Sequence, residues 1–216
     1  MSSSPSPRPL RPTLLALAAC CLTGMLALYA ATAGFRVVST EAGRRLALER
    51  RPAPLPPTVV RRALDGRSLS LGADLASDRR AAIVTFVYTR CQSICSVTGT
   101  ELQQLQARIR SRGLERRVRL LTISFDPADD GAALTAYARR MGADPRLWRF
   151  YGIADAAGRR RLLEVFGIVV VPAPPGDFVH NAAYHVIDRD GRLARIVDIG
   201  AADAALDTAL RLGGGA

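Results

Sequence analysis

A short apolar segment followed at once by two cysteines most constrains what this chain can fold into. Residues 81–88 are apolar, with β-branched and aromatic side chains at their centre and polar residues on both sides. Such a run predicts a strand buried on both faces, as in the middle of an α/β sheet. Cys91 and Cys95 follow, separated by three residues, and the apolar residues after them fall near helical spacing. We therefore expect a helix to begin around the pair.

This position favours reactive thiols. Residues four apart on a helix lie on one face, with Cβ atoms about 5–6 Å apart, so Cys91 and Cys95 could share a metal ion or, after a small adjustment, form a disulfide. The first turn of a helix favours the thiolate, and Arg90 adds a positive charge beside Cys91. A purely structural disulfide would close too short a loop to contribute much stability. Metal ligation and redox exchange remain open as the chemistry of the pair.

The charge of the chain is strongly basic but dispersed. All 30 basic residues are arginine, and the net charge is +11. A nucleic-acid-binding surface would gather these charges on one face among aromatic residues, whereas here they are spread along the sequence in short clusters without aromatics. We interpret them as a solvated surface, with a modest basic face for an acidic protein partner left open.

The N-terminal part predicts a membrane anchor. Residues 1–12 are rich in Ser and Pro and are expected to be disordered, whereas residues 13–35 contain no charge and are long enough to cross a bilayer, which needs about 20 residues. This apolar run exceeds that of an ordinary cleaved signal peptide, which favours an uncleaved anchor. The alternative is a lipoprotein, because the Leu-Ala-Ala-Cys sequence ending at Cys20 resembles a bacterial lipoprotein cleavage box. Arginines on both sides of the segment leave its orientation open.

The remaining chain predicts a linker and one α/β domain. Residues 36–57 end in a Pro-rich run and are expected to act as a spacer, residues 58–212 as the folded domain and residues 213–216 as a flexible tail. Asp65-Gly66 and Asp190-Gly191 predict hairpin turns. The other strands are expected at residues 118–125, 168–171, 183–188 and 193–198, and the other helices at residues 131–141, 155–166 and 201–212. This order predicts a thioredoxin-like α/β sandwich, a fold that keeps its redox centre directly after the first buried strand.

The chain contains two histidines, His180 and His185, and both follow residues 172–176, a Pro/Gly-rich segment expected to be a loop. A copper(I) site combines soft thiolates with an imidazole, so one histidine could complete a site with Cys91 and Cys95. His185 falls within a predicted strand, where a packing role is favoured. His180 precedes that strand and is expected to lie in the loop before it, where a ligand would be mobile enough to close over a metal.

Taken together, these motifs resemble the Sco/SenC family of membrane-anchored copper proteins that help to assemble cytochrome c oxidase. The resemblance extends over residues 58–212. Its motifs are the Phe-Val-Tyr-Thr-Arg-Cys-Gln-Ser-Ile-Cys run at residues 86–95, the Ser-Phe-Asp-Pro run at residues 124–127, and His180 ahead of a strand and an Asp-Gly turn.

The resemblance implies a thioredoxin fold in which Cys91, Cys95 and His180 bind copper and deliver it to the CuA site of cytochrome c oxidase subunit II. It also implies an inner-membrane protein whose domain faces the periplasm. His185 is not implied as a ligand, because the family usually has an aromatic residue there. The resemblance equally allows a thiol–disulfide oxidoreductase that uses Cys91 and Cys95 as a redox pair. Asp126-Pro127 is expected to cap a turn or helix, with no catalytic role.

Two departures from the family pattern concern the site itself. Gln92 and Ser96 follow the cysteines where the family usually has prolines, and Val179 precedes His180 where the family usually has Asp. A carboxylate next to a metal-binding imidazole orients the ring and raises its basicity. Its absence predicts weaker copper binding unless Asp177 takes over the role.

Overall fold

The structure is a computed structural model that describes residues 10–35, 39–91, 94–174 and 176–214. The chain divides into two compact units, residues 1–47 and residues 48–216, and each is described by itself. The second unit thus begins before residue 58, where the sequence predicted the domain to start. Most of the segment expected to be disordered, residues 1–12, lies outside the described residues, and so do residues 215–216 of the expected tail.

The first unit contains a long apolar helix, α1 (Leu10–Ala31). Within Pro12–Ala31, an 18-residue window has a mean hydropathy of 2.1 and no buried residues, so this stretch is long and apolar enough to span a membrane. Leu10 and Arg11 were expected to precede the anchor but belong to the same helix.

The expected linker contains regular structure. Helix α2 (Thr40–Arg50) and the short strand β1 (Ala53–Pro54) lie within residues 36–57, where only a spacer was predicted. Glu41 accepts hydrogen bonds from Arg44 and Arg45, at 2.8 and 2.9 Å, and pairs at these helical spacings stabilise a helix. A helix stabilised by charge pairs has no apolar periodicity, and helices were predicted from that periodicity, so α2 was not predicted.

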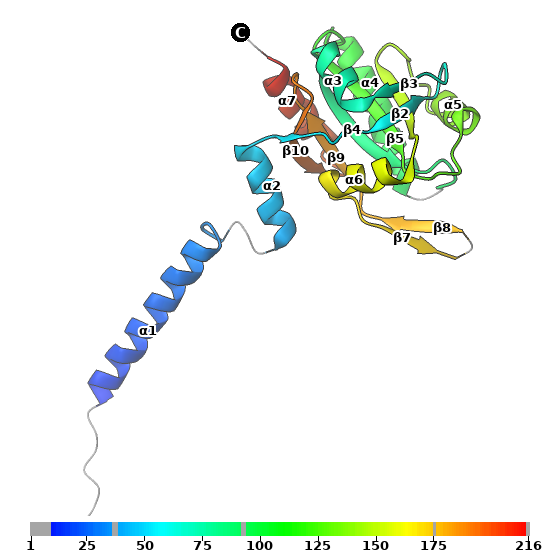
Figure 1. Cartoon of the computed structure of the whole chain (residues 1–216). Coiled ribbons are helices and arrows are strands. Elements are labelled where there is room, and N and C mark those ends of the chain that lie inside the picture. Colours follow the sequence, from blue (N-terminus) through cyan, green and yellow to red (C-terminus); the bar gives the residue numbers. More distant parts are fainter. Residues whose placement is uncertain (1–9, 36–38, 92–93, 175, 215–216) are drawn as a thin grey trace, which may run out of the picture. The chain divides into compact units, whose positions relative to one another are not determined.

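The second unit is built on an eight-stranded mixed sheet in the order β1-β10-β9-β4-β5-β6-β2-β3 (Figure 1). Strands β4, β5 and β6 are parallel, and all other neighbours pair antiparallel. The strands are β2 (Val59–Arg62), β3 (Ser68–Ser70), β4 (Ala81–Val87), β5 (Val118–Ser124), β6 (Trp148–Ile153), β9 (Ala183–Ile187) and β10 (Arg192–Asp198). The helices are α3 (Leu71–Asp78), α4 (Ile94–Ser111), α5 (Gly131–Arg140), α6 (Ala156–Phe166) and α7 (Ala202–Gly213).

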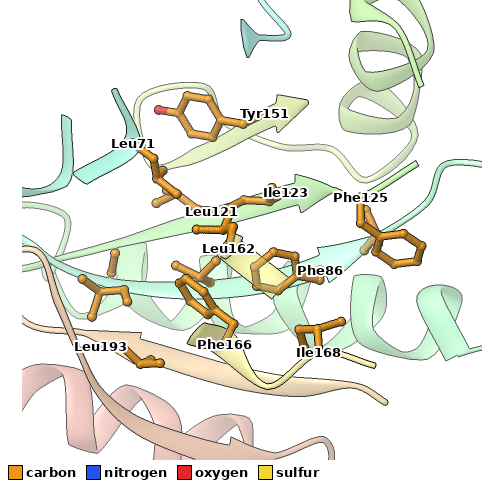
Figure 2. Packing of buried hydrophobic residues seen from close by; sticks show 14 of the residues in the cluster. Leu71, Phe86, Leu121, Ile123, Phe125, Tyr151, Leu162, Phe166, Ile168 and Leu193 are labelled. Carbon is orange, nitrogen blue, oxygen red and sulfur yellow. The ribbon is translucent and has the colours of Figure 1, made fainter. Parts of the chain in front are cut away.

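Helices cover both faces of the sheet. The apolar side chains of α3 and α6 pack in one core cluster, and those of α4, α5 and α7 pack in a second cluster. Strand β4 lies between them, because Val84 and Phe86 belong to the first cluster and Ile83 to the second. Figure 2 shows the first cluster, where the rings of Phe86 and Phe166 meet edge to face at 4.9 Å. All seven residues of β4 are buried, which confirms the predicted two-sided strand.

A two-stranded ribbon stands apart from the main sheet. Strands β7 (Val170–Ala173) and β8 (Asp177–His180) pair antiparallel with each other, and Figure 1 shows the ribbon below α6. The prediction that residues 172–176 form a loop is wrong at its start, because Pro172 lies in β7. A proline is tolerated there since each strand of an isolated ribbon is an edge, where a missing N–H need not break a ladder. His180 was likewise expected in a loop, but it is the last residue of β8.

Candidate copper and thiol site

Cys91 lies in the loop between β4 and α4, at the end of the buried central strand. Its side chain is 8 % exposed, and its amide nitrogen donates a hydrogen bond to the carbonyl oxygen of Tyr88 at 3.2 Å. The expectation that a helix begins at the cysteine pair is correct, since α4 starts at Ile94. Cys91 precedes this helix, however, so the helical four-residue spacing does not describe its relation to Cys95. The backbone of Cys95 is in the first turn of α4, but its side chain lies outside the described residues.

The loop that leads into Cys91 is fastened by an aspartate. Asp129 accepts hydrogen bonds from the amide nitrogen of Thr89 at 2.7 Å, from the Thr89 hydroxyl at 2.6 Å and from the Ser124 hydroxyl at 2.5 Å. Asp129 is 9 % exposed, so these bonds form largely away from water. Two hydrogen bonds from Thr89 to this buried carboxylate fix the loop two residues before the thiol, and the bond from Ser124 ties the carboxylate to the end of β5.

Asp126 binds Arg90, the residue of this loop that follows Thr89. One of its carboxylate oxygens accepts from the guanidinium of Arg90 at 2.8 Å, and the other accepts from the amide nitrogen of Ala128 at 2.9 Å. The second contact is the turn cap predicted for the Asp-Pro motif. The first contact means that the guanidinium of Arg90, whose charge was expected to act on Cys91, is paired with Asp126.

Tyr88 joins the thiol loop to the ribbon. Its hydroxyl donates to the Asp177 carboxylate and lies 3.1 Å from the carbonyl oxygen of Phe178. The same hydroxyl also hydrogen-bonds the side chain of Cys91. Burial and these two side chains hold the pKa of Tyr88 well above its usual range, so the phenol keeps its proton. The hydrogen bonds from Tyr88 and from the Phe178 amide lower the pKa of Asp177.

His180 presents an unpartnered nitrogen in an aromatic setting. Its ring contacts Phe125 and Tyr88 edge to face, with centroids 4.9 and 6.0 Å apart. Nδ1 lies 3.0 Å from the carbonyl oxygen of Asn181, which can only accept, so the neutral ring carries its proton on Nδ1. Nε2 is buried and has no hydrogen-bond partner among the described residues. Burial lowers the pKa of His180, which favours the neutral ring with a lone pair on Nε2.

Asn181 fixes the base of the ribbon. Its side chain accepts from the amide nitrogen of Val169 at 2.7 Å and donates to the carbonyl oxygen of Gly167 at 2.8 Å. Its backbone carbonyl faces His180, so one residue both pins the ribbon to the end of α6 and orients the imidazole. Asn181 was not predicted from the sequence, where its position next to His180 was the one available signal.

His185 has a different environment. It is 1 % exposed in β9, and its ring packs edge to face on Phe86 and Phe166. Its ring nitrogens lie 3.4 Å from the carbonyl oxygen of Val84 and 3.1 Å from that of Phe166. The predicted packing role of His185 is confirmed.

The structure therefore places both Cys91 and His180 next to Tyr88. The pairing of a thiol with a desolvated, neutral imidazole suits copper, for which sulfur and nitrogen are favoured donors. Among the described side chains, a set that omits that of Cys95, no three potential metal-binding groups come together. The three-residue ligand set remains a prediction.

The comparisons with known proteins agree with the sequence motifs. Residues 74–211 match the family model described as SCO1/SenC. The chain belongs to the SCO1/SenC family. No curated protein matches the chain significantly.

Solved structures of the SCO1/SenC family share the fold. A SCO1/SenC family lipoprotein from Bacillus anthracis superposes with a TM-score of 0.66 at 20 % identity, covering 76 % of this chain and 99 % of its own. BsSco, described as a cytochrome c oxidase assembly protein with a disulfide switch, has a TM-score of 0.62 at 19 % identity, covering 76 % and 95 %. Copper-bound ScoI from Bradyrhizobium japonicum has a TM-score of 0.57 at 21 % identity, covering 74 % and 99 %. The predicted thioredoxin-like sandwich is thus confirmed.

Proposed function

We propose that this chain is a copper chaperone that binds one copper ion through Cys91, Cys95 and His180 and passes it to the CuA site of cytochrome c oxidase subunit II. The observation that carries the proposal is Nε2 of His180, which is buried and unpartnered among the described residues. A buried polar atom without a partner is costly, and a metal ion would satisfy it. Relatives from B. japonicum and Arabidopsis thaliana hold copper in their solved structures, which supports copper as the cargo.

The residues of this chain have distinct parts in that function. The two thiolates supply the soft donors that select copper, and the imidazole allows the site to accept either oxidation state. Asn181 keeps the His180 proton on Nδ1, so binding through Nε2 requires no prior loss of a proton from the ring. Transfer proceeds by ligand exchange, with His180 released before the thiolates because it is carried on the ribbon rather than on the main sheet.

The second candidate function is a thiol–disulfide oxidoreductase. The position of Cys91 directly after the central strand favours it, as does the disulfide switch described for BsSco. The thiolate of one cysteine attacks a partner disulfide, which breaks that S–S bond and forms a mixed disulfide. The other cysteine attacks the mixed disulfide, which releases the partner as a dithiol and leaves Cys91 and Cys95 joined by a disulfide. Two electrons thus pass from this cysteine pair to the partner.

An anaerobic copper(I) titration of the reduced full-length chain in detergent, with a competing chelator, separates the two functions. The His180→Ala variant is compared with Val179→Ala, which shortens a neighbouring side chain of the same strand. We expect one copper per wild-type chain, affinity about 10- to 100-fold lower in His180→Ala, and unchanged affinity in Val179→Ala. Disulfide exchange should survive in both variants.

Two results would count against copper delivery. Equal copper affinity in the wild type and His180→Ala would remove His180 from the ligand set. A wild-type chain that binds no copper but reduces disulfides would leave the oxidoreductase as the function.

We further propose that α1 anchors the chain in the inner membrane, with residues 58–212 as a copper-binding domain facing the periplasm. The apolar length of Pro12–Ala31 supports an anchor. The alternative is a lipoprotein cleaved before Cys20, a form that the B. anthracis relative is described as having. The mass of the chain extracted from membranes decides between them, because a lipoprotein would begin at a lipid-modified Cys20.

A further inference from the structure

Strand β8 is tied to the rest of the domain at both of its ends. At the base, the Asn181 side chain bridges to Val169 and Gly167. At the other end, Asp177 and Phe178 accept from the hydroxyl of Tyr88. His180 lies between these two attachments, so its position depends on both.

Tyr88 touches the thiol as well as the ribbon. It follows β4 directly, it is 3 % exposed, and its hydroxyl hydrogen-bonds the Cys91 side chain. Its ring packs on Phe178 and Phe125 at 5.3 and 5.6 Å. The ring contacts hold the ribbon by packing, whereas the hydroxyl adds a directional bond that can break without unfolding the core.

The contacts of Asp177 also settle which group replaces the carboxylate that usually precedes the metal-binding histidine. Asp177 does not take that role, because it accepts from Tyr88 and from the amide nitrogen of Phe178 at 2.8 Å. The Nδ1 of His180 instead faces the carbonyl oxygen of Asn181. Asp177 therefore acts on His180 through the placement of the ribbon.

We propose that Tyr88 is a positioning residue whose hydroxyl, by bonding Asp177, latches the β7–β8 ribbon to the loop that carries Cys91 and so sets the rate at which copper leaves the site. The copper step of this inference rests on the proposed function, and the latch itself does not. Asp177 is exposed, so water competes for its carboxylate and the latch opens more easily than a buried bond. Breaking it swings His180 away while the thiolates still hold the cargo.

The test uses two variants that break the same bond from opposite sides. Tyr88→Phe keeps the ring contacts and removes the hydroxyl, and Asp177→Ala removes the acceptor. Tyr184→Phe is the matched control, because Tyr184 also donates to a carboxylate, that of Glu101, but packs in the second core cluster. Hydrogen exchange of the β7–β8 amides is measured in the reduced, copper-free full-length chain, and copper(I) release to excess chelator is measured in the loaded chain.

We expect both latch variants to speed ribbon exchange and copper release by about three- to tenfold, as the loss of one hydrogen bond implies. The double variant should be no faster than either single one, and Tyr184→Phe should match the wild type in both measurements. Unchanged ribbon exchange in the latch variants overturns the proposal. An effect of Tyr88→Phe that Asp177→Ala does not reproduce also overturns it, because the hydroxyl would then act through Cys91 or the carbonyl oxygen of Phe178 and not through Asp177. If the wild-type chain binds no copper, the proposed function fails, but hydrogen exchange still decides the latch.

Discussion

His180 at the end of β8 and His185 in the middle of β9 are chemically identical side chains in contrasting surroundings. Both rings touch two aromatic rings. Both nitrogens of His185 face backbone carbonyl oxygens, whereas Nε2 of His180 faces none among the described residues. A candidate metal ligand is therefore recognised by an unsatisfied nitrogen held away from water, because burial and aromatic contact are common to both histidines.

The two histidines also lie in parts of the domain that differ in burial. His185 is part of the central sheet, where β4, β5 and β9 are buried along their whole length. His180 is on a ribbon whose residues are half-buried or exposed. Losing His185 should therefore affect stability, and losing His180 should affect function.

The largest effect on stability is expected for His185→Ala. Truncating a fully buried ring leaves a cavity between Phe86 and Phe166 and removes the ring nitrogen beside the Phe166 carbonyl, so we expect a loss of about 3 kcal/mol in the free energy of unfolding. The His180→Ala variant should lose less than about 1 kcal/mol. Urea unfolding of the reduced, copper-free chain, followed by the fluorescence of the single tryptophan, Trp148, measures both. Equal losses would show that the two regions do not differ in this way.

A smaller effect is expected from pH, and it concerns His180. Burial lowers the pKa of this residue in the folded chain, whereas in the unfolded chain it titrates near 6.5. As the pH falls through 6.5 toward the folded-state pKa, the unfolded chain binds more protons, so the folded chain loses stability; below the folded-state pKa this residue causes no further loss.

The His180→Ala variant isolates this contribution. Because the variant lacks the titrating ring, the wild-type chain should lose stability relative to it between pH 7.5 and pH 5.5, measured without copper. The difference in the free energy of unfolding between the two chains could instead stay constant over this range, or favour the wild type at low pH. Either result would mean that His180 accepts the proton in the folded chain at least as readily as in the unfolded chain.

The sequence predicted the central sheet well because its signals are local. Two-sided burial of β4 follows from an unbroken apolar run, and the Asp65-Gly66 and Asp190-Gly191 turns follow from residue types that favour hairpins. Strand β6 and helix α3 were not predicted. Neither has an apolar pattern as regular as that of β4, and neither follows a turn as clear as the Asp-Gly turns. The charge-paired helix α2 was not predicted, because it has no apolar periodicity.

The site was predicted in part. The sequence identified Cys91 and His180 as candidate site residues and predicted the role of Asp126 as a turn cap. The ribbon was not, since prolines in and after β7 indicate a loop unless the strand is known to be an edge. The contacts of Tyr88, Asp129 and Asn181 join segments distant in sequence, and no local pattern predicts which hydrogen bonds folding will close.

The smallest effect is expected for Val179→Asp, which introduces the residue type that the resemblance to the family leads us to expect before His180. Successive side chains of a strand point to opposite faces, so Val179 lies on the face opposite Phe178 and His180 and is 64 % exposed. A carboxylate there would be solvated and remote from the imidazole, whose Nδ1 already faces Asn181. We expect copper(I) affinity to change by less than about threefold, since an exposed charge contributes little.

The matched control is Val171→Asp, because Val171 is the cross-strand partner of Val179 and is 52 % exposed. Both variants add the same charge to the same face of the ribbon, so the competing-chelator titration should give the same affinity for each. A gain of about tenfold or more for Val179→Asp alone would match the effect of a carboxylate that orients the imidazole. It would mean that β8 twists when copper binds, so that the ribbon of the loaded chain no longer holds His180 as the copper-free strand does.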